Sequence, residues 1–441
     1  MSDSAHLRTF DGQSAMPVIA RGQKQHNGWS ASFSLGEENS STIVRLSFGF
    51  LWLLVFAIPW EDAVTIPGFG TGTRLIGIPA LVLGVIAVIA RGKVRHPAAG
   101  HVIMILFALW ATVSYLWSVD QDETLVAASS YRQLLAMVWL IWELAPGLRE
   151  QLLLLNAYVF GTFVSGLDTV YQFLSHHEAA YQRYTGGGSN PNDLALLMAL
   201  SIPAAYFLLI QSKRWMVWVY RFQLILAGTT IFLSAARGGF LAGLVAFSIV
   251  PLIHQRSSGR RRIVGFLTTA LVIFGGLTFL PASSWERIST IPDELREGTL
   301  TGRTLIWGAG FDVFREHPFL GVGAAGFRQS VNRALSEEIV AHNTFLSILV
   351  EQGVIGFSLF CALLGVLALS VSAIPSVPRR FWSVTLAVWV VGVSSLTWEI
   401  RKPTWFFFGL LMAQCASLAS RNSSSSTLVP AGTSFPQTRR A

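Results

Sequence analysis

The sequence predicts an all-α, polytopic integral membrane protein, and three observations carry that prediction. Of its 441 residues, 52% are hydrophobic and 13% are charged, whereas an average soluble domain is about 25% charged. Apolar runs long enough to cross a bilayer, which takes about 20 residues, recur along the chain between short polar segments. The two cysteines, Cys361 and Cys415, lie inside such runs, so neither a disulfide framework nor a thiolate metal site is indicated.

The apolar runs predict about twelve transmembrane helices, each long enough to span a bilayer. We place them at 43–60, 75–90, 100–117, 130–145, 151–174, 193–210, 215–234, 238–254, 263–280, 343–371, 381–398 and 403–420. An even number of spans places both termini on one side of the membrane. One long polar segment, 281–342, interrupts this series.

Basic residues indicate that the shared side of the termini is cytoplasmic. In that orientation the short inner loops hold clusters such as Arg91, Lys93 and Arg95, as the positive-inside rule expects. The net charge of +8 then reflects topology, and no nucleic-acid partner is expected. We expect disordered cytoplasmic tails at 1–42 and 421–441, transmembrane helices at 43–280 and 343–420, and a large periplasmic loop at 281–342.

The polar segment 281–342 uses arginine and no lysine as its basic residue: Arg287, Arg296, Arg303, Arg315, Arg328 and Arg333. Arginine is favoured where a phosphate or carboxylate is bound by two parallel hydrogen bonds. The simpler explanation, pairing with neighbouring Asp and Glu residues on solvated helix faces, accounts for most of the six. A smaller subset is therefore expected to bind an anion.

Arg303 is the main candidate for this anion-binding subset. Apolar spacing between Thr301 and Pro318 predicts an amphipathic helix that a Thr/Gly pair begins and the proline ends. Arg303 then lies in the first turn, where unpaired backbone N–H groups already favour anions. The glycine-rich turn 319–327 has no strand before it, so a nucleotide-binding loop is not expected there.

Two other external segments have similar chemistry. In 233–239 the chain places Arg237 between two apolar spans and among small residues. An arginine near membrane depth is costly unless it meets a partner or a water-filled cavity, although it can also extend to the headgroups. In 183–193, Arg183, Asn190 and Asn192 belong to a Gly/Asn turn whose asparagines can cap a helix or bind sugar hydroxyls.

His342 ends the polar segment, immediately before Asn343, which is the natural cap of the next helix. Nearby arginines depress the pKa of a histidine and keep its imidazole neutral. A neutral histidine beside an anion site suits a general base. Glu351 lies nine residues further along the helix, too deep for this role, and we expect it to pack between helices.

Three groups of residues together resemble the O-antigen ligase family, which also includes O-antigen and exopolysaccharide polymerases. They are Leu-Ser-Ala-Ala-Arg-Gly-Gly at 233–239, Gly-Arg-Thr-Leu-Ile-Trp at 302–307 with His-Pro-Phe-Leu-Gly-Val-Gly at 317–323, and Ala-His-Asn-Thr-Phe-Leu at 341–346 with Glu-Gln-Gly-Val-Ile-Gly at 351–356. The motifs cover residues 185–370. Their order and spacing are more specific than any one of them alone.

The resemblance implies an inverting membrane glycosyltransferase of the bacterial inner membrane that uses no cofactor and no metal. Its donor would be a glycan on undecaprenyl diphosphate, and its active site would face the periplasm. Arg237 and Arg303 would bind the diphosphate and His342 would deprotonate the acceptor hydroxyl. Arg183, Asn190, Asn192, Arg328 and Asn343 are supporting or glycan-binding candidates.

The acceptor stays open at this stage. A ligase uses the lipid A core, a polymerase uses another lipid-linked glycan, and some relatives glycosylate protein. A multi-span transporter or flippase is the alternative from another class, because the chain has many spans. Transporters commonly show internal repeats and broken helices near the midplane, and the sequence shows no clear repeat.

Overall fold

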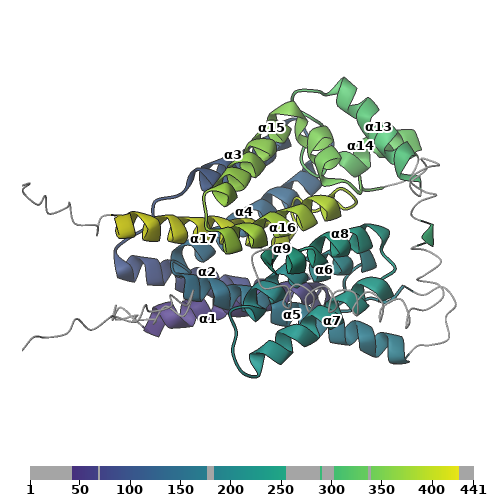
Figure 1. The fold of residues 1–441 in the computed structure, drawn as a ribbon. Coiled ribbons are helices and arrows are strands. Elements are labelled where there is room, and N and C mark those ends of the chain that lie inside the picture. The colour runs from purple at the N-terminus through teal and green to yellow at the C-terminus, as the bar shows by residue number, and fades with distance from the viewer. Residues whose placement is uncertain are drawn as a thin grey trace, which may run out of the picture. The chain divides into compact units, whose positions relative to one another are not determined.

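The computed structural model describes residues 42–67, 70–175, 183–254, 289–290, 302–335 and 339–426, all within one compact unit, Asn39–Ala441. Those residues are mainly helical (Figure 1). The predicted span 263–280 and the arginines Arg287 and Arg296 lie outside them. The elements are α1 (Thr42–Ala57), η1 (Ile58–Ala63), β1 (Thr65–Ile66), β2 (Gly70–Thr71), α2 (Thr73–Arg91), α3 (Ala99–Val113), η2 (Ser114–Leu116), α4 (Gln121–Leu144), α5 (Leu148–Ser175), α6 (Pro191–Leu209), α7 (Met216–Leu233), α8 (Arg237–Phe247), α9 (Ile249–His254), α13 (Arg303–Glu316), α14 (Phe327–Leu335), α15 (Thr344–Ser372), α16 (Ser376–Val393) and α17 (Lys402–Ser426).

Eight helical segments among the described residues are long and apolar enough to cross a membrane. Each predicted span within the described residues overlaps a helix, although 381–398 extends past the end of α16 and 238–254 overlaps both α8 and α9. The eight begin at Thr42, Thr73, Ala99, Gln121, Leu148, Pro191, Met216 and Thr344. The segment Arg237–Ile253 is a shorter apolar helix. An all-α, multi-pass membrane protein is confirmed, and the total of about twelve spans stays a prediction.

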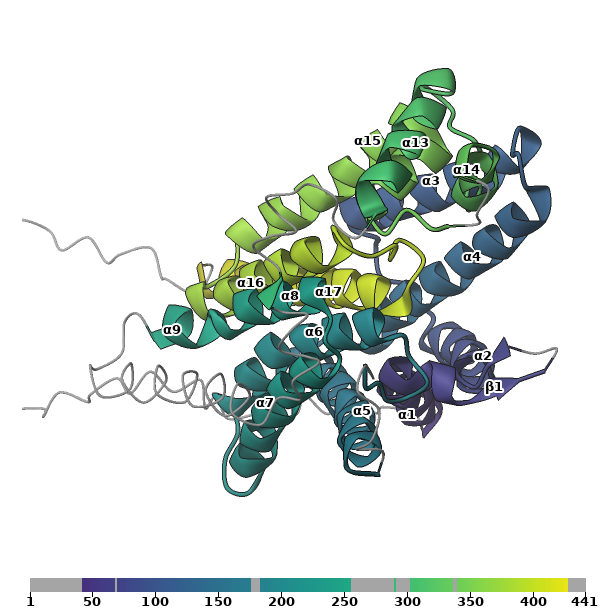
Figure 2. The ribbon, with the colours of Figure 1, turned by 90° about the vertical axis from the view of Figure 1, so that its right-hand side faces the viewer.

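Burial distinguishes the central helix from the peripheral ones. In α6, 83% of the most apolar window is buried inside the protein, compared with 28% in α2. A helix that is apolar on all sides belongs in a core, and α6 packs against α5, α7, α8 and α16 (Figure 2). Leu81, Val82 and Ile86 of α2 stay exposed. In a bilayer such side chains meet lipid at no cost.

α15 is interrupted at Gly353, which has φ 64° and ψ −170°. The backbone groups released at this break are hydrogen-bonded by the segment that follows α13. Val322 N–H donates to Val350 O at 3.1 Å, Gly323 N–H donates to Glu351 O at 2.9 Å, and Val354 N–H donates to Pro318 O at 2.9 Å. Backbone groups at membrane depth must find such partners within the protein.

The glycines of the 319–327 turn serve this junction. Gly321 has φ +70°, and a Cβ there would lie 2.4 Å from the backbone of Glu351. Only glycine allows both the conformation and the approach. A small separate core joins α13 and α14 to the first half of α15 (Figures 1 and 2), and its buried members are Ile306, Val322, Phe327, Val331, Ala341, Leu346 and Val350.

Candidate functional site

A cavity of about 1070 Å³ opens between the transmembrane helices and the segments on either side of α14. One part of its wall is apolar and comes from α1, α2 and α4: Leu54, Ile78, Leu81, Leu134, Met137 and Leu140. The other part is polar and comes from η1, the start of α6, the segment 324–328, the residues around the start of α15, and the α16–α17 connection. The cavity therefore has the amphipathic lining that a lipid with a polar head requires.

His342 lies on the polar wall in an unusual backbone conformation. Its φ is +47°, a region in which non-glycine residues are uncommon and which often marks a functional site. Two contacts fix the backbone on either side. Trp307 Nε1 donates to Ala341 O at 3.0 Å, and Asn343 caps α15 by accepting from Phe345 N–H and Leu346 N–H at 3.0 and 3.1 Å.

The surroundings of His342 favour a neutral imidazole. Burial lowers its pKa from the ordinary value, the positive charge of Arg303 lowers it further, and the negative charge of Asp193 acts in the opposite direction. The structure thus brings together His342 and Arg303, two of the residues predicted from the sequence. A histidine in this state is unprotonated near neutral pH and is therefore available as a base.

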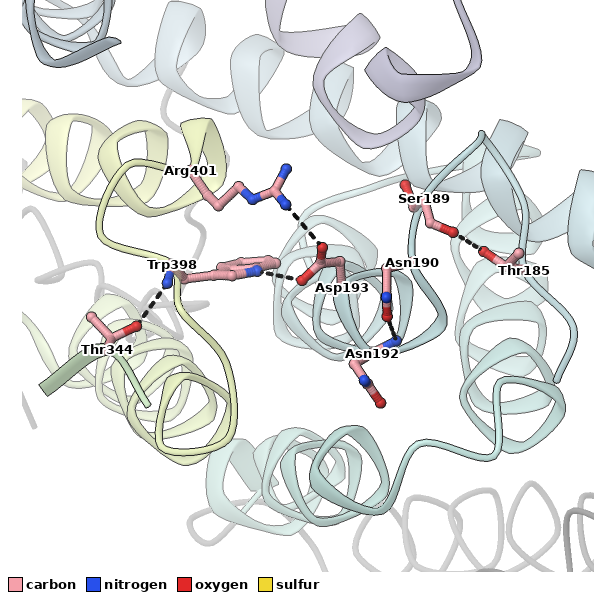
Figure 3. Close-up of polar contacts among 8 residues, drawn as sticks. All are labelled: Thr185, Ser189, Asn190, Asn192, Asp193, Thr344, Trp398 and Arg401. Atoms are coloured by element: carbon pink, nitrogen blue, oxygen red, sulfur yellow. Dashed lines mark hydrogen bonds and ion pairs between the residues drawn. The ribbon is translucent and has the colours of Figure 1, made fainter. Parts of the chain in front are cut away.

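Asp193 connects the start of α6 to the α16–α17 connection. Its Oδ1 accepts from Trp398 Nε1 at 2.8 Å, and its Oδ2 accepts from Arg401 Nη2 at 3.2 Å (Figure 3). Trp398 N–H also donates to Thr344 Oγ1 at 2.8 Å, so the same connection is attached to the start of α15. Three distant parts of the sequence are held around one polar wall.

The predicted Gly/Asn turn is ordered by its own side chains. Asn190 caps α6 by accepting from Asn192 N–H at 2.9 Å (Figure 3). Arg183 donates to Asn192 Oδ1 at 2.6 Å and to Ser234 O at 3.0 Å. Asn190 and Asn192 line the cavity, whereas Arg183 and Asn343 do not. Capping is thus an observed role of both Asn190 and Asn343.

The arginines occupy different positions around the cavity. Arg328 is on its wall, and neither Arg303 nor Arg237 is. Arg303 begins α13, and Arg237 begins α8 beside the α16–α17 connection, where a Cβ on Gly238 would lie 2.1 Å from Ser395 Oγ. Arg315 pairs with Asp312 at 2.7 Å on an exposed surface, which is the structural role expected for most of these arginines.

Several cavity residues were not singled out from the sequence. Glu61 accepts from Thr73 Oγ1 at 2.9 Å and pairs with Lys402, and both charged residues line the cavity. Glu399 and Arg401 lie on the same wall. Glu351 packs between helices as expected, since it is 5% exposed, and it also lines the cavity. The available signal was the run Glu-Ile-Arg-Lys at 399–402, a charged interruption between two apolar stretches.

Comparisons with known proteins agree with the motifs. The O-antigen ligase family model matches residues 222–361, which contain Arg237, Arg303, Arg328 and His342. The exopolysaccharide production protein ExoQ of Rhizobium meliloti (strain 1021) is 25% identical over 305 residues. That match covers 62% of this chain and 65% of the relative, slightly less than two thirds of its length. The resemblance to the O-antigen ligase family is thereby confirmed, by a family-model match at residues 222–361 and by this relative.

Proposed function

We propose that the protein is an inverting glycosyltransferase that moves a glycan from undecaprenyl diphosphate to an acceptor hydroxyl at the periplasmic face of the bacterial inner membrane. The family match already indicates a membrane enzyme of the ligase or polymerase kind. The observation that carries the finer proposal is the position of His342 on the wall of a cavity that is partly polar and partly apolar, with the charge of Arg303 near enough to lower the pKa of His342.

His342 acts as the general base in this mechanism. The acceptor oxygen forms a bond to the anomeric carbon of the donor glycan, and the bond from that carbon to the diphosphate oxygen breaks. His342 takes the proton of the acceptor hydroxyl, and undecaprenyl diphosphate leaves with the electron pair. General-base catalysis of this kind contributes roughly 10²–10⁴-fold to a rate.

Arginines stabilise the leaving group. Negative charge develops on the diphosphate as the glycosidic bond breaks, and fixed cations in a partly dry site lower the energy of that state. Arg303 lies close enough to His342 to depress its pKa, and Arg328 is on the cavity wall. We assign diphosphate binding to Arg303 and Arg237, with Arg328 in support, and we propose that the reaction needs no metal ion.

The apolar wall receives the start of the polyprenyl chain. Side chains of α1, α2 and α4 form it, among them Leu54, Ile78 and Met137. Exposed apolar residues on α2, such as Val82 and Val85, continue from this wall toward the surface that faces lipid. The long donor tail can then stay in the membrane while its head reaches the polar wall.

The lipid A core is the acceptor in the primary proposal, which makes the enzyme a ligase. The similarity to a protein named for exopolysaccharide production favours a second candidate, a polymerase that uses another lipid-linked glycan as the acceptor. A deletion strain distinguishes them. A ligase deletion leaves the lipid A core without long glycan and leaves that glycan on the carrier, whereas a polymerase deletion leaves single repeat units.

The mechanism is tested with purified protein in lipid nanodiscs and the glycan-loaded carrier isolated from the cells of origin. Wild-type protein is expected to release undecaprenyl diphosphate in the presence of a chelator, and His342→Ala is expected to stop that release. His317→Ala is the matched control, because His317 is exposed at the end of α13. Normal turnover by His342→Ala would refute the general-base role.

A further inference from the structure

Ser347 lies between two buried glutamates on the cavity wall. Its Oγ is 3.2 Å from Glu351 Oε1 and 3.1 Å from Glu399 Oε1. The two glutamates are 5% and 4% exposed, and all three residues line the cavity. They come from α15 and from the α16–α17 connection, so the folded structure alone brings them together.

The number of protons available determines the ionisation of Glu351 and Glu399. A serine hydroxyl has one proton and can donate to only one of the two carboxyl groups. The second contact is a hydrogen bond only if that carboxyl group is itself protonated and donates to Ser347 Oγ. The two glutamates therefore hold one proton between them when both bonds form, and together they have a single negative charge.

The two carboxyl groups differ in whether their second oxygen accepts a hydrogen bond. Glu351 Oε2 accepts from Ala325 N–H at 2.8 Å, but Glu399 Oε2 has no hydrogen-bond partner among the described residues. The neighbouring Thr397 Oγ1, also at the cavity, is in the same situation. A buried carboxylate oxygen without a donor is costly, so Glu399 Oε2 is suited to accept from a donor that enters the cavity.

The backbone holds Glu399 in place for such a ligand. Its carbonyl oxygen accepts from Trp405 Nε1 at 2.7 Å, and the preceding Trp398 is bonded to both Thr344 and Asp193. Because the carboxyl group is also bonded to Ser347, little conformational freedom remains to be lost on binding. This is the arrangement that a preorganised subsite requires.

We propose that Glu399 and Thr397, supported by Ser347 and Glu351, form a subsite that binds hydroxyl groups of a sugar. A hydroxyl donates to Glu399 Oε2 and a second group on the sugar accepts from Thr397 Oγ1. A diphosphate offers no such donor and is repelled by the negative charge, so it belongs on the arginine side of the cavity. This inference rests on the proposed function, since the sugar is part of the donor or the acceptor.

The test compares two probes on the full chain in nanodiscs: the glycan-loaded carrier and undecaprenyl diphosphate without a sugar. Glu399→Gln keeps the shape and an acceptor for Ser347 but replaces the acceptor Oε2 with an amide that donates, and Thr397→Val removes only the hydroxyl. Each variant is expected to weaken binding of the glycan-loaded carrier by about tenfold or more and to leave binding of undecaprenyl diphosphate unchanged. Glu123→Gln is the control, because Glu123 is exposed elsewhere on the cavity wall.

A second arm identifies the source of the sugar. If donor binding is unchanged and the KM for the acceptor rises about tenfold, the subsite binds the acceptor glycan. The subsite would be overturned if both Glu399→Gln and Thr397→Val kept the wild-type affinity for the donor and the wild-type KM for the acceptor. It would also be overturned if the variants lost affinity equally for the glycan-loaded carrier and for undecaprenyl diphosphate. Failure of the proposed function itself looks different, because wild-type protein would then release no undecaprenyl diphosphate.

Discussion

Trp307 on α13 donates its indole N–H to the backbone carbonyl of Ala341 at 3.0 Å, directly before His342. Residues four apart on a helix share a face, so Arg303, one turn before Trp307, lies on the same side of α13. One helix thus fixes the backbone of the proposed base and supplies the charge that lowers its pKa. The α13 helix therefore contributes to the geometry and to the electrostatics of the site.

Replacing Trp307 by phenylalanine tests this coupling. The ring keeps most of the packing, but the hydrogen bond that supports the unfavourable φ of His342 is lost. We expect kcat to fall by roughly fivefold, the equivalent of about 1 kcal/mol for one hydrogen bond, with little change in thermal stability. Trp117→Phe is the control, because Trp117 Nε1 donates to Leu320 O at 3.2 Å in an exposed position. An equal fall in kcat in Trp307→Phe and Trp117→Phe would contradict a specific link between Trp307 and His342.

The pH profile of the enzyme depends on two charges of opposite sign near His342. Removing the positive charge in Arg303→Gln raises the pKa of His342, since Arg303 lowers it. The imidazole then becomes protonated, and inactive as a base, at a higher pH. We expect the acidic limb of kcat/KM, which reports the free enzyme's base, to move to higher pH in this variant, whatever its maximal rate.

Asp193→Asn makes the complementary prediction. Asp193 raises the pKa of His342, so its neutralisation lowers that pKa and moves the acidic limb to lower pH. The asparagine oxygen can still accept from Trp398, which keeps the local structure. Profiles that shift in the same direction in the two variants would show that His342 does not set the acidic limb.

Gly353 is predicted to be essential for the junction between α15 and the turn before α14. A Cβ there would lie 2.2 Å from Phe319 O, and φ is +64°. We expect Gly353→Ala to cost about 2 kcal/mol or more, from backbone strain and displacement of the turn, and to lower the melting temperature measured by scanning fluorimetry.

Gly365 provides the matched control in the same helix. A Cβ there meets nothing within 4 Å, and alanine is favoured over glycine in a helix by up to about 1 kcal/mol. Gly365→Ala is expected to leave the melting temperature unchanged or raise it slightly. If both variants lowered it equally, the break in α15 would not be the cause.

Local sequence patterns were sufficient to predict where most of the helices lie. Hydrophobic runs located the helices, and the Thr-Gly-Arg sequence with Pro318 located α13, which the structure places at Arg303–Glu316. Asn190 and Asn343 were identifiable as caps because capping depends on neighbouring residues alone. These features need no knowledge of how the helices pack.

Features that depend on packing were not predictable in the same way. Glu351 was assigned to helix packing because its helical angle places it away from His342, and the break at Gly353 was not foreseen. Glu399 meets Glu351 through Ser347, although the two glutamates are 48 positions apart in the sequence. No periodicity encodes such a contact, because it depends on how α15, α16 and α17 are arranged.

Arg237 begins α8, directly before Gly238, which lies against Ser395, and its proposed role is to bind the diphosphate with two hydrogen bonds. Lysine keeps the charge but cannot offer a planar pair of donors. We expect Arg237→Lys to lower kcat/KM by about tenfold or more, because a charge-assisted bond is worth about 1.5–3 kcal/mol. Arg315→Lys is the control, since Arg315 pairs with Asp312 on an exposed surface. Unaltered kcat/KM in Arg237→Lys would instead favour an arginine that extends to the lipid headgroups.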